Sequence, residues 1–181
     1  MPEEPQSRVP APSPARIEAA TSAVLVLDLT EYNHPVGPAH HACVTAVAGF
    51  LERVRAARVP IVFTGARTQL GMPVEAALKR QQSELLIYPD AYDKFVGGEL
   101  TPYLDQHRAK TLVITGGQSN MAVMYTATGA ARNHHYQVYI PLDGVYSEDP
   151  YRYEYSLYQL TTLPGSAIPP KFTRLSDITF Y

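Results

Sequence analysis

The chain has 181 residues, of which 45% are hydrophobic and 18% charged, and its formal net charge is −2. This length predicts one domain with a sizeable core. The small net charge and scattered basic residues give no reason to expect nucleic acid or an anionic membrane as a partner. Cys43 is the only cysteine, which excludes an internal disulfide and a zinc site built from cysteines. No apolar run reaches the roughly 20 residues of a membrane-spanning helix.

The first twenty residues differ in composition from the rest of the chain. They start acidic, contain five prolines within the first fourteen positions and lack the apolar stretch of a secretory signal. We therefore expect a flexible, proline-rich N-terminal arm over residues 1–20 and a single domain over residues 21–181. A cytoplasmic location follows by default.

Strand and helix patterns alternate along the domain. Short apolar runs predict buried strands at 23–29, 59–64, 84–88, 110–115 and 137–142, with an edge strand at 170–173. Apolar residues at helical spacing predict helices at 41–58, 98–106, 119–132 and 151–163, with a short helix at 73–80. This alternation predicts an α/β fold with a single doubly wound, mainly parallel sheet of five or six strands and helices on both faces. Ligands of such sheets bind beyond the carboxyl ends of the strands, where the segments after Asp28, Thr64 and Gly116 should converge.

Asp28 closes the apolar run VLVLD. A carboxylate at that point has lost much of its water and needs a partner, or it holds a proton more readily than an exposed one. That environment suits general acid/base catalysis. An Asp that caps the following loop through backbone N–H groups is an equally good interpretation.

The stretch GGQSN at 116–120 joins a buried strand to a helix. Glycines let a backbone approach a ligand, and free N–H groups at a helix N-terminus favour a carboxylate, a phosphate or a developing oxyanion. An ordinary structural turn explains the same residues. The spacing fits neither a dinucleotide-binding loop nor a P-loop, so no cofactor is expected.

The six histidines show no metal-binding spacing on a helix, so no metal site is indicated. His34 lies six residues after Asp28, close enough in sequence to face the same pocket. Three tyrosines of the last helix, at 151, 155 and 158, share one helical face, which favours a contact between subunits. Cys43 lies in an apolar helix stripe and is expected to be an inert core residue.

Four stretches carry a family resemblance: AVLVLDLTEYN at 23–33, VPIVFT at 59–64, YDKFVGGELTPYLDQHRAKTLVITGG at 92–117 and VITGGQSNMAVMYTATGAARNHHYQVYIPLDG at 113–144. With them, the chain from Ala23 to Ile178 resembles the isochorismatase-like superfamily, also called the cysteine hydrolase group. That group includes nicotinamidases, carbamoylsarcosine amidohydrolases and the vinyl-ether-cleaving isochorismatases. The resemblance implies the α/β fold described above, a small-molecule substrate, and a homodimer or larger homo-oligomer.

In the amidohydrolase members of this family the catalytic triad is Asp, Lys and Cys. The resemblance places Asp28 at the Asp position and Ala122 at the Cys position. It places the Lys at positions 88–90, several residues before the aromatic aligned with Phe95. Lys94 directly precedes Phe95, and we expect it to point elsewhere. The resemblance therefore implies a divergent member that lacks both the Cys and the Lys.

An alanine cannot form a thioester, so amide hydrolysis through a covalent intermediate is excluded for this chain. Isochorismatases also lack the cysteine, and their chemistry resembles acid-catalysed addition of water to an enol ether, although they keep the lysine. The first hypothesis is therefore an enzyme that acts on a small cyclic or carboxylated molecule by non-covalent acid/base chemistry centred on Asp28. The ligand would be oriented by Gly117, Gln118, Ser119, Tyr92, His34 and Lys94.

Two other hypotheses are open. The chain is a catalytically silent homologue that binds a ligand or partner, or it is an amidohydrolase trapped by a Cys-to-Ala change at position 122. In the trapped enzyme Lys94 or Lys79 would supply the missing base. Gain of amidase activity on restoring a cysteine at position 122 would distinguish the trapped enzyme from the other two.

Overall fold

A seven-stranded parallel sheet forms the centre of the protein. The structure, a computed structural model, describes residues 8–163 and 168–181. The strands are β2 Ser22–Leu27, β3 Ile61–Thr64, β4 Leu85–Ile87, β5 Thr111–Gly117, β6 Gln137–Pro141, β7 Val145–Tyr146 and β8 Lys171–Thr173. Six of them follow the order β4-β3-β2-β5-β6-β8, and β7 pairs with the end of β5. Every pairing is parallel.

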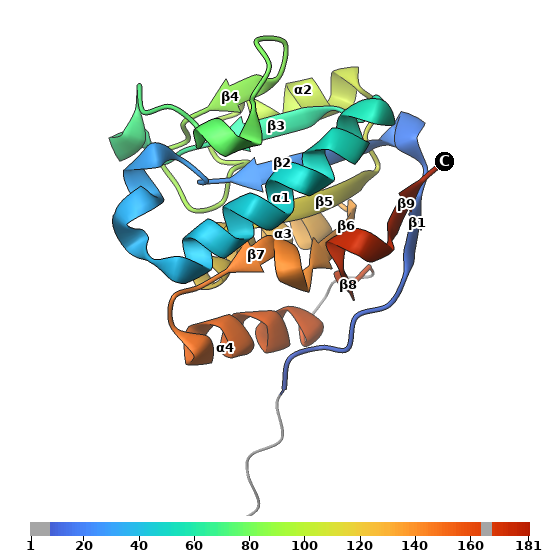
Figure 1. Cartoon of the computed structure of the whole chain (residues 1–181). Helices are drawn as coiled ribbons and strands as arrows, with labels where there is room; N and C mark the ends of the chain where they lie inside the picture. The colour runs from blue at the N-terminus through green and yellow to red at the C-terminus, as the bar shows by residue number, and fades with distance from the viewer. Residues whose placement is uncertain (1–7, 164–167) are drawn as a thin grey trace, which may run out of the picture.

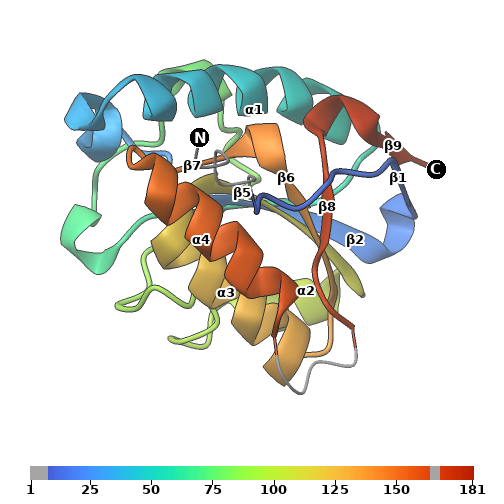
Figure 2. The same cartoon turned by 90° about the horizontal axis from the view of Figure 1, so that it is seen from below.

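Helices cover both faces of this sheet (Figure 1). Helix α1 Pro38–Ala56 lies on one face, and α2 Leu100–Gln106, α3 Met124–Thr128 and α4 Pro150–Thr161 lie on the other, as Figure 2 shows from below. Side chains of β2 alternate between the two core layers: Val24 and Val26 pack under α1, and Leu25 and Leu27 pack under the other helices. A strand that is buried on both faces explains the continuous apolar run in the sequence.

The doubly wound α/β fold predicted from the sequence is confirmed. The sheet has seven strands rather than five or six because β7, only two residues long, is too short to give a pattern of its own. The helix predicted at 73–80 is a single 3-10 turn at Ala76–Leu78. The helix predicted at 119–132 consists of α3 between two wider π-helical turns, Ser119–Val123 and Gly129–Asn133.

A second, two-stranded parallel sheet joins the two ends of the described chain. Within the segment expected as an N-terminal arm, β1 Ala15–Ile17 pairs with β9 Ile178–Phe180. Ala15 and Ile17 are each only 2% exposed and belong to the core layer under α1. Residues 1–7 of the expected arm lie outside the described residues.

The ends of three central strands meet at one edge, as expected for the site. Leu27, the last residue of β2, pairs with Thr64 of β3 and with Gly116 of β5. Gly116 has a φ of +103°, and a Cβ there would lie 2.1 Å from the carbonyl oxygen of Leu27. Only glycine allows this close approach of the two strand ends. The register therefore places Asp28 beside the Gly116–Gly117 turn.

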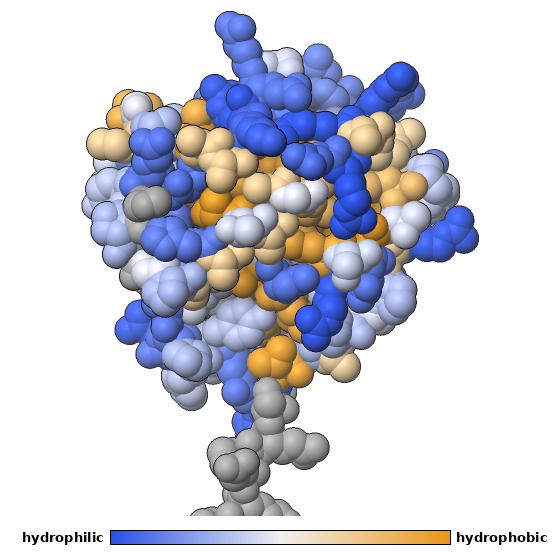
Figure 3. Space-filling view, viewed as in Figure 1, coloured by the Kyte–Doolittle hydropathy of each residue, from blue (hydrophilic) through white to orange (hydrophobic). Residues whose placement is uncertain are grey.

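No helix in the described part of the chain is long and apolar enough to cross a membrane. The face that carries α1 exposes hydrophobic side chains near its middle, surrounded by hydrophilic ones (Figure 3).

Replacing Ile17 by alanine should lower the free energy of unfolding by about 2–4 kcal/mol, because the buried side chain leaves a cavity in the core. Arg16→Ala is the matched control: Arg16 is exposed and its guanidinium lies 5.2 Å from the Tyr181 ring centroid, a contact worth less than about 1 kcal/mol. Urea unfolding followed by circular dichroism measures both. If Ile17→Ala lowered the free energy of unfolding no more than Arg16→Ala does, β1 would contribute little to the stability of the fold.

Candidate active site

An ion pair lies at the carboxyl edge of the sheet. The Nζ atom of Lys94 is 3.0 Å from Oδ1 of Asp28, and the hydroxyl of Thr64 donates a hydrogen bond of 2.8 Å to the same oxygen. The Lys94 side chain is 1% exposed and that of Asp28 is 13% exposed. Two opposite charges so far from water stabilise each other, whereas either one alone would carry a large desolvation cost.

The backbone of Asp28 is held independently of its carboxylate. Its N–H donates to the carbonyl of Thr64, and its carbonyl accepts a 2.7 Å hydrogen bond from the side-chain amide of Asn33. These contacts hold the residue at a φ of +55°, in the left-handed region. The carboxylate contacts Thr64 and Lys94 instead of capping the following loop. The acid/base role of Asp28 stays a prediction.

The ammonium group of Lys94 retains unused hydrogen-bonding capacity. It lies close enough to Asp28 for an ion pair, but the contact is not aligned as a hydrogen bond, and no described residue accepts one from Nζ. An ammonium carries three N–H donors, and burial without acceptors is costly. These donors are therefore available to a ligand.

The loop that carries Lys94 is fixed by its neighbours rather than by secondary structure. The N–H of Lys94 donates to the hydroxyl of Thr126 in α3, and that hydroxyl donates to the carbonyl of Tyr92, both at 3.1 Å. Phe95 is buried and stacks on His134 with 4.2 Å between ring centroids. With Phe95 directed into the core, its neighbour Lys94 is directed to the sheet edge.

The prediction that Lys94 points away from Asp28, and that the site therefore lacks a lysine, is wrong. Lys94 lies directly beside Asp28. The error comes from placing the family lysine several residues before Phe95. A signal is present in the sequence, since Lys94 is the only lysine between positions 80 and 109. Its direction cannot be read from the sequence because it depends on how Phe95 and Thr126 pack.

No reactive thiol lies at the expected nucleophile position. Ala122 is 1% exposed and its methyl group belongs to the core layer under α2–α4. Cys43 lies instead on α1, where its thiol donates to the carbonyl of Gly144 at 3.3 Å. Burial raises the pKa of the Cys43 thiol to about 12, so it is almost entirely protonated at neutral pH and is a poor nucleophile.

The turn at 116–120 is more enclosed than its glycines predict. A Cβ on Gly117 would lie 2.1 Å from the ring of Tyr146, so this glycine makes room for a tyrosine rather than for a ligand. The peptide bond between Gly117 and Gln118 is cis, and Gln118 is half-buried. Ser119 is fully buried, and its hydroxyl accepts a 3.0 Å hydrogen bond from Ser156 of α4. The side chain of Ser119 thus fastens the turn to α4, although the sequence suggests a ligand-binding role for it.

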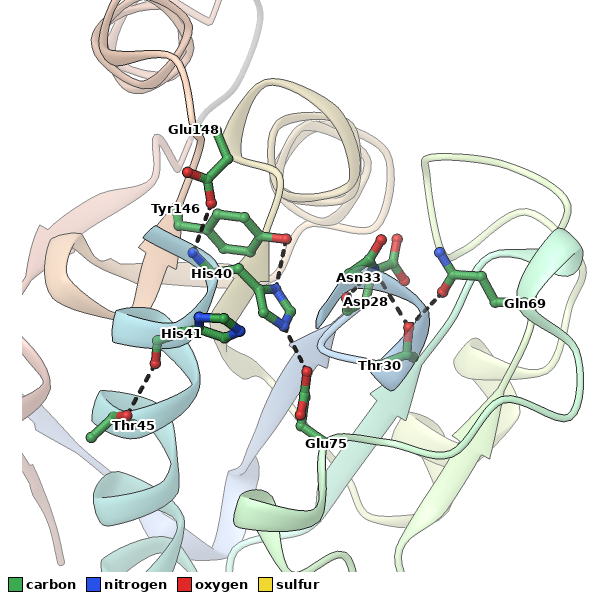
Figure 4. A network of polar contacts seen from close by, with 10 residues as sticks. All are labelled: Asp28, Thr30, Asn33, His40, His41, Thr45, Gln69, Glu75, Tyr146 and Glu148. Carbon is green, nitrogen blue, oxygen red and sulfur yellow. Dashed lines mark hydrogen bonds and ion pairs between the residues drawn. The ribbon is translucent and has the colours of Figure 1, made fainter. Parts of the chain in front are cut away.

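Tyr146 is in turn held by a buried polar network that the sequence does not indicate (Figure 4). His40 is fully buried, with Nδ1 3.0 Å from the Tyr146 hydroxyl and Nε2 2.9 Å from a carboxylate oxygen of Glu75. Burial raises the pKa of the Tyr146 phenol well above its ordinary value, so the phenol is protonated at neutral pH. With the Tyr146 hydroxyl at Nδ1 and the Glu75 carboxylate at Nε2, both ring nitrogens of His40 have a hydrogen-bond partner. The backbone N–H of His40 also donates to Glu148, which caps the N-terminus of α1.

Two cavities lie near these residues. One of about 300 Å³ is lined by Lys94, Tyr92 and Arg67, among others. A larger one of about 690 Å³ lies between α1 and α4, with Cys43 and Tyr146 in its wall, but neither Asp28 nor Lys94 lines it. The smaller cavity is the better candidate for a ligand site because the ion-paired lysine forms part of its wall.

The remaining expected site residues occupy different positions. Tyr92 is 56% exposed at the smaller cavity, where its ring lies 5.8 Å from that of Tyr125. His34 lies in the 3-10 segment Glu31–Val36, and its side chain is outside what the structure describes. Among the described residues, no three His, Cys, Asp or Glu side chains are grouped to hold a metal ion.

The tyrosines expected at a subunit contact are exposed on α4. Tyr151, Tyr155 and Tyr158 are 76%, 47% and 39% exposed, and the first two stack on each other at 6.2 Å. The oligomeric state stays a prediction.

Comparison with known proteins decides the family. The family model of the isochorismatase domain matches residues 22–168. The chain belongs to the isochorismatase family. No curated protein matches the chain.

Solved structures of isochorismatase-like proteins share the fold. An isochorismatase-like hydrolase from Alkaliphilus metalliredigens is 22% identical, with 86% of this chain and 96% of that one covered and a TM-score of 0.74. A nicotinamidase from Staphylococcus aureus is 18% identical over 86% and 99% of the two chains, also with a TM-score of 0.74. A MAR1 ribonuclease from Caenorhabditis elegans is 16% identical over 90% and 81%, with a TM-score of 0.76. At these identities the likeness shows the fold alone.

In this isochorismatase-family protein, Lys94→Met should lower the free energy of unfolding by roughly 3 kcal/mol, because the buried Asp28 carboxylate loses its countercharge. Asp28→Asn should also destabilise, since it leaves the ammonium uncompensated. The double variant has neither charge, so its loss should fall short of the sum of the two by about 1–3 kcal/mol. Urea unfolding of the four proteins at pH 7 measures this coupling. Strictly additive losses would mean that the two side chains do not interact.

Proposed function

We propose that the chain is an enzyme that performs non-covalent acid/base chemistry on a small cyclic or carboxylated molecule, with Asp28 as the proton donor and acceptor. The observation that carries the proposal is the buried Asp28–Lys94 ion pair next to a turn whose nucleophile position holds only a methyl group. The lysine of this pair lines the cavity of about 300 Å³, and paired charged groups at a cavity are candidates for a catalytic site. Hydrolysis of an enol ether needs an acid and water but no covalent nucleophile.

The two oxygens of Asp28 suit different roles. Oδ1 is held by Thr64 and Lys94, whereas no described residue donates a hydrogen bond to Oδ2. In the proposed reaction Oδ2 of the Asp28 carboxylate first takes up a proton from solvent and then gives it to the terminal carbon of the enol ether, and water adds to the resulting oxocarbenium ion. Lys94 compensates the charge left on Asp28. The hemiketal then breaks down to an alcohol and a carbonyl compound, and the proton released by the water returns to Asp28.

A trapped amidohydrolase is the second candidate, and the position of Lys94 favours it more than the sequence does. With Asp28 and Lys94 already paired, a single residue at position 122 separates this chain from an Asp, Lys and Cys set. A silent binding protein is the weaker alternative because a buried ion pair has no evident use there. The ribonuclease likeness carries no substrate argument, and a net charge of −2 does not favour RNA.

A panel of cyclic enol ethers, isochorismate included, tests the first candidate. Hydrolysis of an enolpyruvyl ether releases a keto acid, which is read by NADH oxidation in a coupled lactate dehydrogenase assay. Asp28→Asn should lower the rate by about 10²-fold or more, because it removes the proton donor. Asp28→Glu is the conservative control and should retain part of the activity. Equal rates for Asp28→Asn and the unchanged protein, or no turnover of any enol ether, would contradict the proposal.

Ala122→Cys tests the second candidate. If the chain is a trapped amidohydrolase, this variant should gain hydrolysis of nicotinamide or N-carbamoylsarcosine, measured as released ammonia. A thiol reagent at pH 8 reports on the new cysteine alone, because burial raises the pKa of Cys43 to about 12 and keeps that thiol protonated. An Ala122→Cys variant whose introduced thiol reacts with the reagent but which has no amidase activity would exclude this candidate.

A further inference from the structure

The smaller cavity beside Lys94 has a composition that selects for a particular ligand. It measures about 300 Å³ and is formed by the segment after β3 and the segment after β4. Its wall consists of Ala66, Arg67, Thr68, Pro89, Asp90, Ala91, Tyr92 and Lys94. A volume of this size is at the lower end of ligand pockets and suits a molecule with one ring.

Two cationic side chains contribute to this wall from different depths. Lys94 is buried, and its ammonium has no hydrogen-bond acceptor among the described residues. Arg67 is exposed, and within residues 8–163 and 168–181 its guanidinium forms no ion pair. Asp90 is the one carboxylate of the wall and is also exposed. Asp28 balances Lys94, and Arg67 forms no ion pair with Asp90, so the guanidinium of Arg67 is free to pair with a carboxylate of a ligand.

The rest of the wall favours a flat ring. Tyr92 presents an exposed aromatic ring at the cavity, braced by the neighbouring ring of Tyr125. Pro89, Ala66 and Ala91 supply small apolar surfaces. Flat rings stack well on tyrosine, and a guanidinium forms paired hydrogen bonds with a carboxylate.

We propose that this cavity binds a small planar ring that carries a carboxylate, with Arg67 as the residue that recognises the carboxylate and Lys94 donating to a ring substituent. If the proposed function holds, the ligand is the substrate, and in that respect the inference rests on the proposed function. It narrows the substrate to ring carboxylic acids. Arg67 acts in specificity and takes no part in proton transfer. A neutral amide of the same shape would leave the guanidinium without an anionic partner.

Binding of benzoate and of benzamide to the whole chain, followed by two-dimensional ¹H–¹⁵N NMR titration, tests the proposal without any turnover. Benzoate should bind at least about tenfold more tightly than benzamide, and Arg67→Gln should remove that preference. Arg67→Lys should keep part of it. Arg108→Gln is the matched control, because Arg108 is exposed just before β5, at the opposite edge of the sheet, and its loss should change neither affinity.

The same titration separates this proposal from the proposed function. Benzoate binding that depends on Arg67, together with no hydrolysis of any enol ether, would overturn the enzyme proposal and support the ligand assignment. Equal affinity for benzoate and benzamide, an unchanged benzoate affinity in Arg67→Gln, or absence of benzoate binding would overturn the ligand assignment. Inorganic phosphate serves as a further probe: if it competes with benzoate as strongly as nicotinate does, the cavity recognises anions without regard to a ring, which would also overturn it.

Discussion

The site depends on one buried pair of opposite charges. Asp28 and Lys94 lie far apart in the sequence, and neither is stable in the interior without the other. Their meeting requires two things of the fold. The sheet must end β2 at Leu27, beside Thr64 and Gly116, and the loop before α2 must fasten to Thr126. The parallel register and the packing of α3 therefore both serve to place one carboxylate and one ammonium 3.0 Å apart.

Protein side chains fill the space on the glycine-turn side of this pair, and a cavity lies on the Lys94 side. The ring of Tyr146 covers Gly117, and its hydroxyl is fixed by His40, which Glu75 holds in turn, so the glycine turn is filled by the protein itself. The smaller cavity lies on the other side, towards the ends of β3 and β4, where Lys94 and Arg67 form part of its wall. A ligand that reaches the ion pair would therefore approach from the segments after these strands and not across the turn.

The sequence predicts the sheet far better than it predicts the site. Buried strands and amphipathic helices leave local periodic patterns, and Asp28 is conspicuous because it interrupts an apolar run. The role of Lys94 has no such pattern, because residues 88–99 form neither helix nor strand, and the side-chain direction follows from tertiary packing of Phe95. The network of His40, Glu75 and Tyr146 joins positions 35 and 106 residues apart, so nothing local in the sequence could indicate it. The sequence suggests a ligand at the glycine of position 117 because the tyrosine above that glycine cannot be foreseen.

The contribution of the ion pair to folding stability indicates whether the pair serves the fold or a ligand. Replacing a buried ion pair by well-packed apolar side chains is often neutral or stabilising by about 1–4 kcal/mol, so such a pair is a poor way to hold a fold together. The Asp28–Lys94 pair should stabilise the fold even less, because the ammonium makes no hydrogen bond with a described residue and one carboxylate oxygen receives none. A purely structural pair would be expected to satisfy those groups. Ammonium donors that are left unsatisfied beside a cavity are instead what a bound ligand would complete, as the proposed function requires.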